Sequence, residues 1–208
     1  MDILSFNSQL KFILDQIFDV DGDIVELGVH TGNNSIQFML QSPETKYWGF
    51  DTFCGYTKED IETSPNKQGL LDNEGRWVCD KNETIDRIKR FRGLIKEITP
   101  SDKKFANFEI IKGDLKKTLP EQIKSNNLKK VALLYVDCNA YLPAIKGIEA
   151  VYPILSSGGI ICIDEHQDGG ETKAIKETAD KHGLDVNETG FKFESGVHSN
   201  PSKYIVKK

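Results

Sequence analysis

The sequence predicts an α/β protein with a doubly wound, mostly parallel sheet and an antiparallel hairpin at its C-terminal end. Two observations lead to this class. Short apolar runs alternate with segments of helical periodicity, and acidic residues stand at or just past the end of most of these runs. Such alternation builds a parallel sheet with helices on both faces and right-handed crossovers. Ligands bind these sheets beyond the carboxyl ends of the strands, so we expect the functional site there.

The length and composition of the chain are those of one ordinary globular domain. Its 208 residues can form a full α/β core, and we expect a single domain over residues 1–208. Hydrophobic residues make up 38% of the chain and charged residues 28%, which is typical of globular proteins. The formal net charge of −5 argues against a nucleic-acid partner, because surfaces that bind nucleic acids are basic.

Several other classes of protein are not expected. No apolar run approaches the roughly 18 residues of a transmembrane helix, and the first residues lack the basic and apolar regions of a signal peptide. We therefore expect a cytoplasmic protein without a membrane partner, and homo-oligomeric assembly stays open. The cysteines show no C-x-x-C spacing, so neither disulfides nor a zinc site is expected.

The first elements are an amphipathic helix and a strand–helix–strand unit. The helix is expected over residues 1–20, and four apolar residues share one of its faces: Leu10, Ile13, Leu14 and Ile17. Residues 23–51 then form the strand–helix–strand unit. Its first strand, residues 24–27, ends at Gly28, and its second, residues 47–50, ends at Asp51.

The segment over residues 52–82 has a different character. It is rich in Gly, Pro, Asn, Asp and Glu, and it lacks periodicity. It also carries Phe53, Tyr56 and Trp77, which a disordered linker would rarely hold. Long loops in small domains are usually functional. We interpret this segment as a lid or acceptor-binding insertion rather than a plain surface excursion.

The remaining elements continue the alternation. Pro120 is expected at the first position of a helix, where its missing N–H is tolerated, and Ser157 to Gly159 are expected to form a turn. Residues 115–126 are expected to hold a turn and the short helix that begins at Pro120. Further helices are expected over residues 83–97, 141–155 and 170–183, and strands over residues 108–112, 130–137, 160–163, 185–193 and 203–207.

The turn inside residues 23–51 indicates a nucleoside ligand without phosphates. Gly28 and Gly32 bracket a turn that needs small residues or a positive φ, but His30 occupies the place of the second glycine in the dinucleotide fingerprint G-x-G-x-x-G. A pyrophosphate would fit poorly there. Asp51, about 20 residues further on, can bind ribose hydroxyls, and Glu26 can face a positive group. S-adenosylmethionine has these features, since it carries an ammonium and a sulfonium but no phosphate.

Acidic residues at the ends of two later strands suggest a metal ion. Asp137, Asp164 and Glu165 offer hard oxygen ligands, which suit Mg²⁺ or another divalent cation rather than zinc. Such an ion could hold an acceptor and lower the pKa of its hydroxyl. His166 could take the released proton, or Asp137 could share that role. The simpler alternative is that the acids cap helices and that His166 is a surface histidine.

Five segments resemble the macrocin O-methyltransferase family of S-adenosylmethionine-dependent, metal-assisted sugar O-methyltransferases. The similarity spans about residues 23–180 and keeps the order and spacing of these motifs. They read VELGVHTGNNS, YWGFDTFCGY, IKGDLKKTLP, LLYVDCNAYLPAIKGIEAVYPIL and SSGGIICIDEH. The resemblance implies a Rossmann-like sheet of the class I methyltransferase type.

The resemblance also implies a role for each matching residue. The donor's methionine part would be held by Glu26, Gly28, Thr31, Gly32, Asn33, Asn34 and Ser35. Asp51 would bind the ribose, flanked by Thr52 and Phe53, and Asp114 beside Gly113 would contact the adenine amino group. The metal ligands would be Asp137, Asp164 and Glu165, with His166 near the acceptor hydroxyl.

The chain departs from the family pattern at two places. The family commonly has Asp-Gly-Asp-x-Tyr after the central strand, where this chain has Asp137-Cys138-Asn139-Ala140-Tyr141. It also commonly has Asp-Asp where this chain has Asp164-Glu165. Glutamate still offers oxygen to Mg²⁺, although it reaches one methylene further.

Three alternatives differ in substrate or class. The acceptor could be a catechol-like diol or a nitrogen atom, since vicinal oxygens on a flat ring would suit the same metal. The departures at Asn139 and Glu165 leave open a nucleoside-binding module without turnover. A dinucleotide oxidoreductase is disfavoured by His30 and by the lack of a third glycine at the right spacing.

Overall fold

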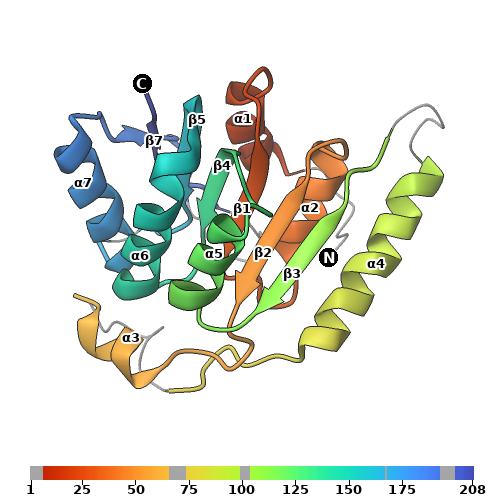
Figure 1. Ribbon diagram of the computed structural model, residues 1–208, viewed down its shortest axis with the longest axis horizontal. Coiled ribbons are helices and arrows are strands. Elements are labelled where there is room, and N and C mark those ends of the chain that lie inside the picture. The colour runs from red at the N-terminus through yellow and green to blue at the C-terminus, as the bar shows by residue number, and fades with distance from the viewer. Residues whose placement is uncertain (1–6, 66–73, 99–103, 167, 193–199) are drawn as a thin grey trace.

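The computed structural model describes residues 7–65, 74–98, 104–166, 168–192 and 200–208, which form one mixed sheet flanked by helices (Figure 1). The strand order is β3-β2-β1-β4-β5-β7-β6. Neighbours from β3 to β5 are parallel, and β7 is antiparallel to both β5 and β6. This confirms the predicted fold class. The strands are β1 (Asp23–Leu27), β2 (Tyr47–Asp51), β3 (Phe108–Lys112), β4 (Val131–Val136), β5 (Leu155–Ile163), β6 (Asn187–Glu188) and β7 (Lys203–Val206).

Helices cover both faces of the sheet. Apolar side chains of α5, α6 and α7 build the core on one face, and those of α1, α2 and α4 build it on the other. The short α3 lies at the edge of the sheet toward which the strand arrows point (Figure 1). The helices are α1 (Ser8–Gln16), α2 (Asn33–Gln41), α3 (Lys58–Thr63), α4 (Lys81–Ile98), α5 (Leu115–Lys124), α6 (Tyr141–Val151), the 3₁₀ turn η1 (Tyr152–Ile154) and α7 (Gly170–His182).

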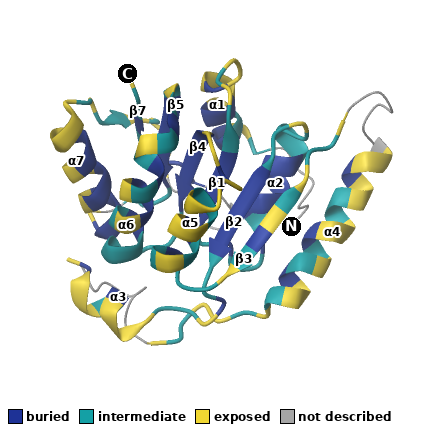
Figure 2. Ribbon diagram, viewed as in Figure 1, coloured by how far each residue is buried: buried dark blue, intermediate teal, exposed yellow. Residues whose placement is uncertain are grey.

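The core forms where the sequence is apolar in the predicted periods. Every residue of β4 is buried, as expected for a central strand between two helical layers (Figure 2). The predicted apolar face of the first helix is buried too. That helix is shorter than expected, since α1 begins at Ser8 after an Asn7 N-cap, and residues 1–6 lie outside the described part of the chain.

The middle of the sheet contains the topological switch point. From β1 the strand order continues through β2 and β3 in one direction, while β4 and β5 lie in the other. Connections that leave β1 and β4 therefore diverge, and the carboxyl ends of these two strands border a crevice. Gly28 and Asp137, which the sequence marked as functional, directly follow these two strands.

The expected turn at Ser157 to Gly159 lies inside a strand, so that prediction was wrong. In β5, Leu155 pairs with Val131 but Ile160 pairs with Leu133, which marks a bulge. Gly158 has φ +78°, a conformation that glycine adopts without strain. The glycines therefore bend the strand instead of ending it.

Pro120 lies in the interior of α5, not at its first position as predicted. The helix begins at Leu115, because the side chain of Asp114 accepts the N–H of Lys116 and caps it. Proline removes one intrahelical hydrogen bond, but a buried apolar face that includes Leu115 and Leu119 holds the helix.

Two further elements differ from the sequence prediction. The segment expected to lack regular structure contains α3, whose first turn is a capping box in which Thr57 and Asp60 bond reciprocally. The strand expected near residues 185–193 is limited to β6, and residue 193 lies outside the described residues. Both elements are too short to show an apolar period.

Cys54, Cys79, Cys138 and Cys162 are all free thiols, and Cys162 is fully buried in the core. In the described parts of the chain, no helix combines the length and the apolar character that crossing a membrane requires.

Candidate functional site

The turn after β1 brings two strand ends into direct contact. Gly28 has φ +91°, and a Cβ atom placed on it would lie 1.9 Å from the carbonyl oxygen of Asp137. No side chain fits in that space, so glycine is required where β1 approaches the end of β4. The close approach leaves the mouth of the crevice lined by backbone at this point.

The carboxylate of Asp51 organises the turns after β1 and β2. One of its oxygens accepts the backbone N–H groups of Val29 and His30, both at 2.8 Å, and the other accepts that of Phe53 at 2.6 Å. His30 and Phe53 have φ +48° and +56°, a region that non-glycine residues rarely occupy. His30 therefore adopts a glycine-like backbone at the place of the fingerprint's second glycine, and Asp51 stabilises that conformation.

The start of α2 is held by an arginine that was not among the predicted site residues. Gly32 is the N-cap and provides no side chain for capping. Arg87 of α4 donates instead to the carbonyl oxygen of Thr31 and, at 2.5 Å, to the side chain of Asn33. Thr31 and Asn33 thus accept hydrogen bonds from arginine rather than cap the helix. More than 50 residues of sequence separate Arg87 from these partners, so no local pattern indicates the contact. The only available signal was an arginine on the polar face of the helix predicted over residues 83–97.

Glu26 is completely buried beneath this turn. Its Oε2 accepts hydrogen bonds from the hydroxyls of Ser35, at 3.0 Å, and Tyr47, which ties β1 to α2 and β2. Its Oε1 has no hydrogen-bond partner among the described residues. Burial raises the pKa of the Glu26 carboxyl to about 8.

Two aspartates follow the paired ends of β4 and β5. Asp137 accepts from the side-chain amide of Asn34 at 2.8 Å, and Asp164 accepts from the hydroxyl of Tyr135 at 2.8 Å and the backbone of Asn200 at 2.6 Å. Loss of solvation raises the pKa of both carboxyls, and the charge of Asp164 raises the pKa of Asp137 further.

The two residues after Asp164 are engaged locally. Glu165 Oε2 accepts the backbone N–H groups of Gly169 and Thr172, so it caps the start of α7. The Nε2 atom of His166 lies 2.8 Å from the carbonyl oxygen of Asn200. The described residues contain no group of three or more His, Cys, Asp or Glu side chains arranged to hold a metal ion.

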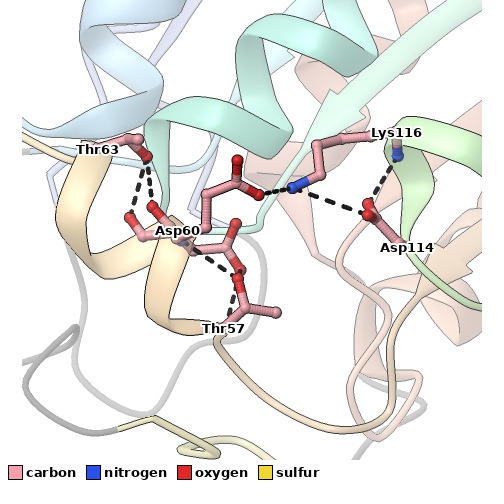
Figure 3. A network of polar contacts seen from close by, with 6 residues as sticks. Thr57, Asp60, Thr63, Asp114 and Lys116 are labelled. Carbon is pink, nitrogen blue, oxygen red and sulfur yellow. Dashed lines mark hydrogen bonds and ion pairs between the residues drawn. The ribbon is translucent and has the colours of Figure 1, made fainter.

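The loop after β3 is joined to α3 by a lysine (Figure 3). Asp114, next to Gly113, caps α5, and Lys116 lies 3.8 Å from its carboxylate and 2.5 Å from that of Glu59. Lys116 thus links the start of α5 to the segment between β2 and α4. In Figure 3 the capping box of Thr57 and Asp60 lies in the first turn of the same short helix.

A cleft opens at this edge of the sheet. Of the sequence-predicted site residues in the described chain, Gly28, Asp51, Thr52 and Asp137 line it. The others, including Asp164, Glu165 and His166, are not among its lining residues. The full lining is Gly28, His30, Phe50, Asp51, Thr52, Gly55, Tyr56, Asp60, Arg76, Trp77, Leu115, Asp137, Cys138, Asn139 and Pro143.

The described part of the segment over residues 52–82 forms one wall of this cleft. Trp77 is 45% exposed, has φ +67°, and sets its ring against that of His30 at a centroid distance of 5.3 Å. Tyr56 and Arg76 line the same wall. Phe53 is instead buried in the core. Residues 66–73 of this segment lie outside the described chain.

Comparison with known proteins identifies the family. The family model for macrocin-O-methyltransferase (TylF) matches residues 7–189. No curated protein shows a significant match. The calicheamicin methyltransferase CalS11 superposes with a TM-score of 0.68 at 24% identity, covering 99% of this chain and 78% of that chain. In its apo structure, CalS11 is described as a TDP-rhamnose 3′-O-methyltransferase. The O-methyltransferase NovP gives a TM-score of 0.66 at 19% identity, covering 96% and 79%.

These structural likenesses show a shared fold, that of the Rossmann-like class I methyltransferases. The family model covers most of the chain, including the turn after β1, Asp51 and the acids after β4 and β5. The protein is therefore a methyltransferase, and it belongs to the macrocin O-methyltransferase family.

Proposed function

We propose that the protein transfers the methyl group of S-adenosylmethionine to a hydroxyl of a small, sugar-containing acceptor, with help from a divalent cation. The observation that carries the proposal is the cleft at the switch point, where the turn after β1, the Asp51 carboxylate and Asp137 meet an aromatic wall. CalS11, which shares the fold, is described as acting on a TDP-linked sugar, and this supports a sugar acceptor.

The donor would lie along the turns after β1, β2 and β3. Gly28 leaves the backbone open to a ligand, and the strained turn at His30 does not offer the glycine approach that a pyrophosphate needs. Asp51 and Thr52 would contact the ribose, with Phe53 behind them, and Asp114 beside Gly113 would reach the adenine. The turn from Thr31 through Gly32, Asn33, Asn34 and Ser35 would take the methionine part, with Glu26 buried beneath it.

The reaction would be an in-line displacement. The acceptor oxygen attacks the methyl carbon, the bond from carbon to sulfur breaks, and neutral S-adenosylhomocysteine leaves. The hydroxyl proton passes to a base. Asp137 lines the cleft, so it is better placed for this role in the described structure than His166, which lies at the Asn200 carbonyl. The enzyme contributes orientation of donor and acceptor.

The chemistry of the donor set fits a divalent cation. Asp137, Asp164 and Glu165 are oxygen ligands, and the charge of Asp164 opposes ionisation of Asp137, which a cation between them would relieve. Bound there, the cation would act as a Lewis acid that favours ionisation of the acceptor hydroxyl. Glu165 would have to use Oε1 or give up its bonds at the start of α7 to join such a site, because its Oε2 accepts two backbone N–H groups.

The direct test offers the purified protein S-adenosylmethionine and Mg²⁺ with three sets of acceptors: nucleotide-linked sugars, catechols and amines. With a sugar acceptor, we expect S-adenosylhomocysteine to form and the mass of the acceptor to rise by one CH₂, because a methyl group replaces its hydroxyl hydrogen. Turnover only with catechols or only with amines would show that the acceptor belongs to that class and not to the sugars. Tight donor binding without product from any of these acceptors would favour a binding module.

The same assay in excess chelator measures the contribution of the metal to methyl transfer. We expect methyl transfer to fall at least about tenfold and to return when Mg²⁺ is restored, since a metal contributes several kcal/mol to such steps. Full activity in chelator would contradict metal assistance while leaving the methyltransferase assignment intact.

The wall formed by residues 52–82 is proposed as the acceptor-binding lid. Trp77 holds a strained backbone and an exposed ring at the cleft, next to His30, and strained backbone of this kind is concentrated at functional sites. We expect Trp77→Ala to raise the KM for the acceptor roughly tenfold, equivalent to about 1.4 kcal/mol, with little change in donor affinity. Phe18→Ala, which removes another exposed aromatic ring outside the cleft lining, is the control. If Trp77→Ala left the KM for the acceptor unchanged, a contact between the Trp77 ring and the acceptor would be excluded.

A further inference from the structure

One buried carboxylate has no part in the chemistry described so far. Glu171 lies in the first turn of α7 and is completely buried. Its Oε1 accepts the backbone N–H groups of Cys138 at 2.7 Å and Asn139 at 2.5 Å. Its Oε2 has no hydrogen-bond partner among the described residues. The side chain therefore reaches across from α7 to the loop that follows β4.

That loop carries cleft residues in an unusual conformation. Asp137, Cys138 and Asn139 all line the cleft. Asn139 has φ +52°, which is uncommon for any residue other than glycine. Backbone in such a conformation persists only where its surroundings hold it. The two hydrogen bonds to Glu171 supply that restraint at the point where the chain turns from Asp137 into α6.

The start of α7 is itself fixed in place. A Cβ atom on Gly170 would lie 2.3 Å from the backbone nitrogen of Tyr141, so the helix packs backbone to backbone against the loop. A Cβ atom on Gly169 would collide with the Glu165 side chain. Glu171 therefore projects from a closely packed helix start that lies directly against the loop.

Packing alone does not account for a glutamate at this position. Glu165, Asp137 and Asp164 are close enough for their charges to oppose ionisation of Glu171. A buried acid beside three others is unfavourable, and an apolar side chain would fill the space without that penalty. What an apolar side chain cannot do is accept the N–H groups of Cys138 and Asn139.

We propose that Glu171 is a positioning residue that holds the loop from Asp137 to Asn139 and thereby aims the Asp137 carboxylate into the cleft. The effect of Glu171 on catalysis rests on the proposed methyl transfer. Its effect on the conformation of the loop does not. Glu171 acts through the backbone it binds and does not touch the substrate. Its essential property is the reach of a hydrogen-bond acceptor, not its charge.

Two variants separate reach from charge. Glu171→Gln keeps an acceptor oxygen at the same distance but cannot ionise, whereas Glu171→Asp keeps the carboxyl group and shortens the side chain by one methylene. We expect the Gln variant to keep kcat within about threefold, and the Asp variant to lose at least about tenfold in kcat with a smaller change in the KM for S-adenosylmethionine. Glu121→Asp, an exposed change on α5, is the control.

Hydrogen exchange of the Cys138 and Asn139 amides gives a readout that does not depend on methyl transfer. We expect both amides to stay protected in Glu171→Gln and to exchange at least about tenfold faster in Glu171→Asp. Equal protection in the wild-type and Asp proteins, or a Gln variant as impaired as Asp, would overturn the proposal. If the wild-type protein formed no S-adenosylhomocysteine, the proposed function would fail while the exchange result still decided the positioning role.

Discussion

Replacing Asp51 by alanine is expected to weaken S-adenosylmethionine binding at least about a hundredfold. The Asp51 carboxylate accepts three backbone N–H groups, two of them from His30 and Phe53 in strained conformations. Hydrogen bonds to a charged group contribute about 1.5–3 kcal/mol each, and a hundredfold change in affinity needs about 2.7 kcal/mol. Alanine would remove both the proposed ribose contact and the restraint that shapes the turns on either side of it.

The measurement is calorimetric titration with S-adenosylmethionine on variants shown by circular dichroism to be folded. Asp51→Asn retains one acceptor oxygen, so we expect a smaller loss, of about tenfold. Asp23→Ala is the matched control. Asp23 accepts a hydrogen bond from Trp48 at 2.7 Å, but it stands at the start of β1, away from the cleft lining. Equal affinity of the wild-type and Asp51→Ala proteins would remove Asp51 from the donor site.

The hydrogen bonds of Asp51 also limit how it can bind ribose. A carboxylate offers about four acceptor positions, and three are occupied in the described structure. One ribose hydroxyl can be added at Oδ1 without disturbing the turns. Binding both hydroxyls, as the sequence suggested, requires Val29, His30 or Phe53 to give up its hydrogen bond to Asp51. A titration series with 2′-deoxy and 3′-deoxy donor analogues distinguishes the two cases.

The fold could be predicted because its signals are local. The apolar runs that became β1 to β5 are short, and acids or glycines end most of them, so alternation alone gave the parallel sheet. The elements that were missed or displaced give weak periodic signals. Six residues are too few for α3 to show an apolar face, and the bulge at Gly158 looks like a turn until its partner strands are known.

The candidate site could be predicted only in part, because strand ends locate residues but not their hydrogen-bond partners. The sequence placed Asp137, Asp164 and Glu165 at one edge of the sheet, and the structure has them there. It could not show that Glu165 caps α7 or that Asp137 alone of the three lines the cleft. Arg87 and Glu171 act across more than 30 residues of sequence, a distance at which no local pattern indicates contact.

The stability of the protein is expected to fall as the pH rises from about 4.5 to about 8, through the titration of Glu26. The carboxyl is fully buried and bonded to Ser35 and Tyr47, and burial raises its pKa to about 8 from an ordinary value of 4.5. Between these two values the folded state binds more protons at Glu26 than the unfolded state does. The stabilisation is therefore complete below pH 4.5, and is lost as pH approaches 8, by at most ~1.4 kcal/mol per pH unit.

Glu26→Gln separates this contribution from that of the other buried acids. Glutamine has the shape of the protonated carboxyl and cannot ionise. The free energy of unfolding of the variant should therefore lack the part of the decline with pH that comes from Glu26. Asp164 and Glu171 also have raised pKa values, but they are present in both proteins and Glu26 is not a cause of their shifts, so they cancel in the difference. The charge of Glu26 helps to raise the pKa of Asp137, so the difference also contains this coupling. Urea unfolding from pH 5 to pH 8 should show the variant gaining several kcal/mol on the wild type. Glu109→Gln, an exposed change on β3, should run parallel to the wild type. Parallel curves for Glu26→Gln would mean that the Glu26 carboxyl is ionised within the fold, and that the buried network beneath the donor turn carries a negative charge.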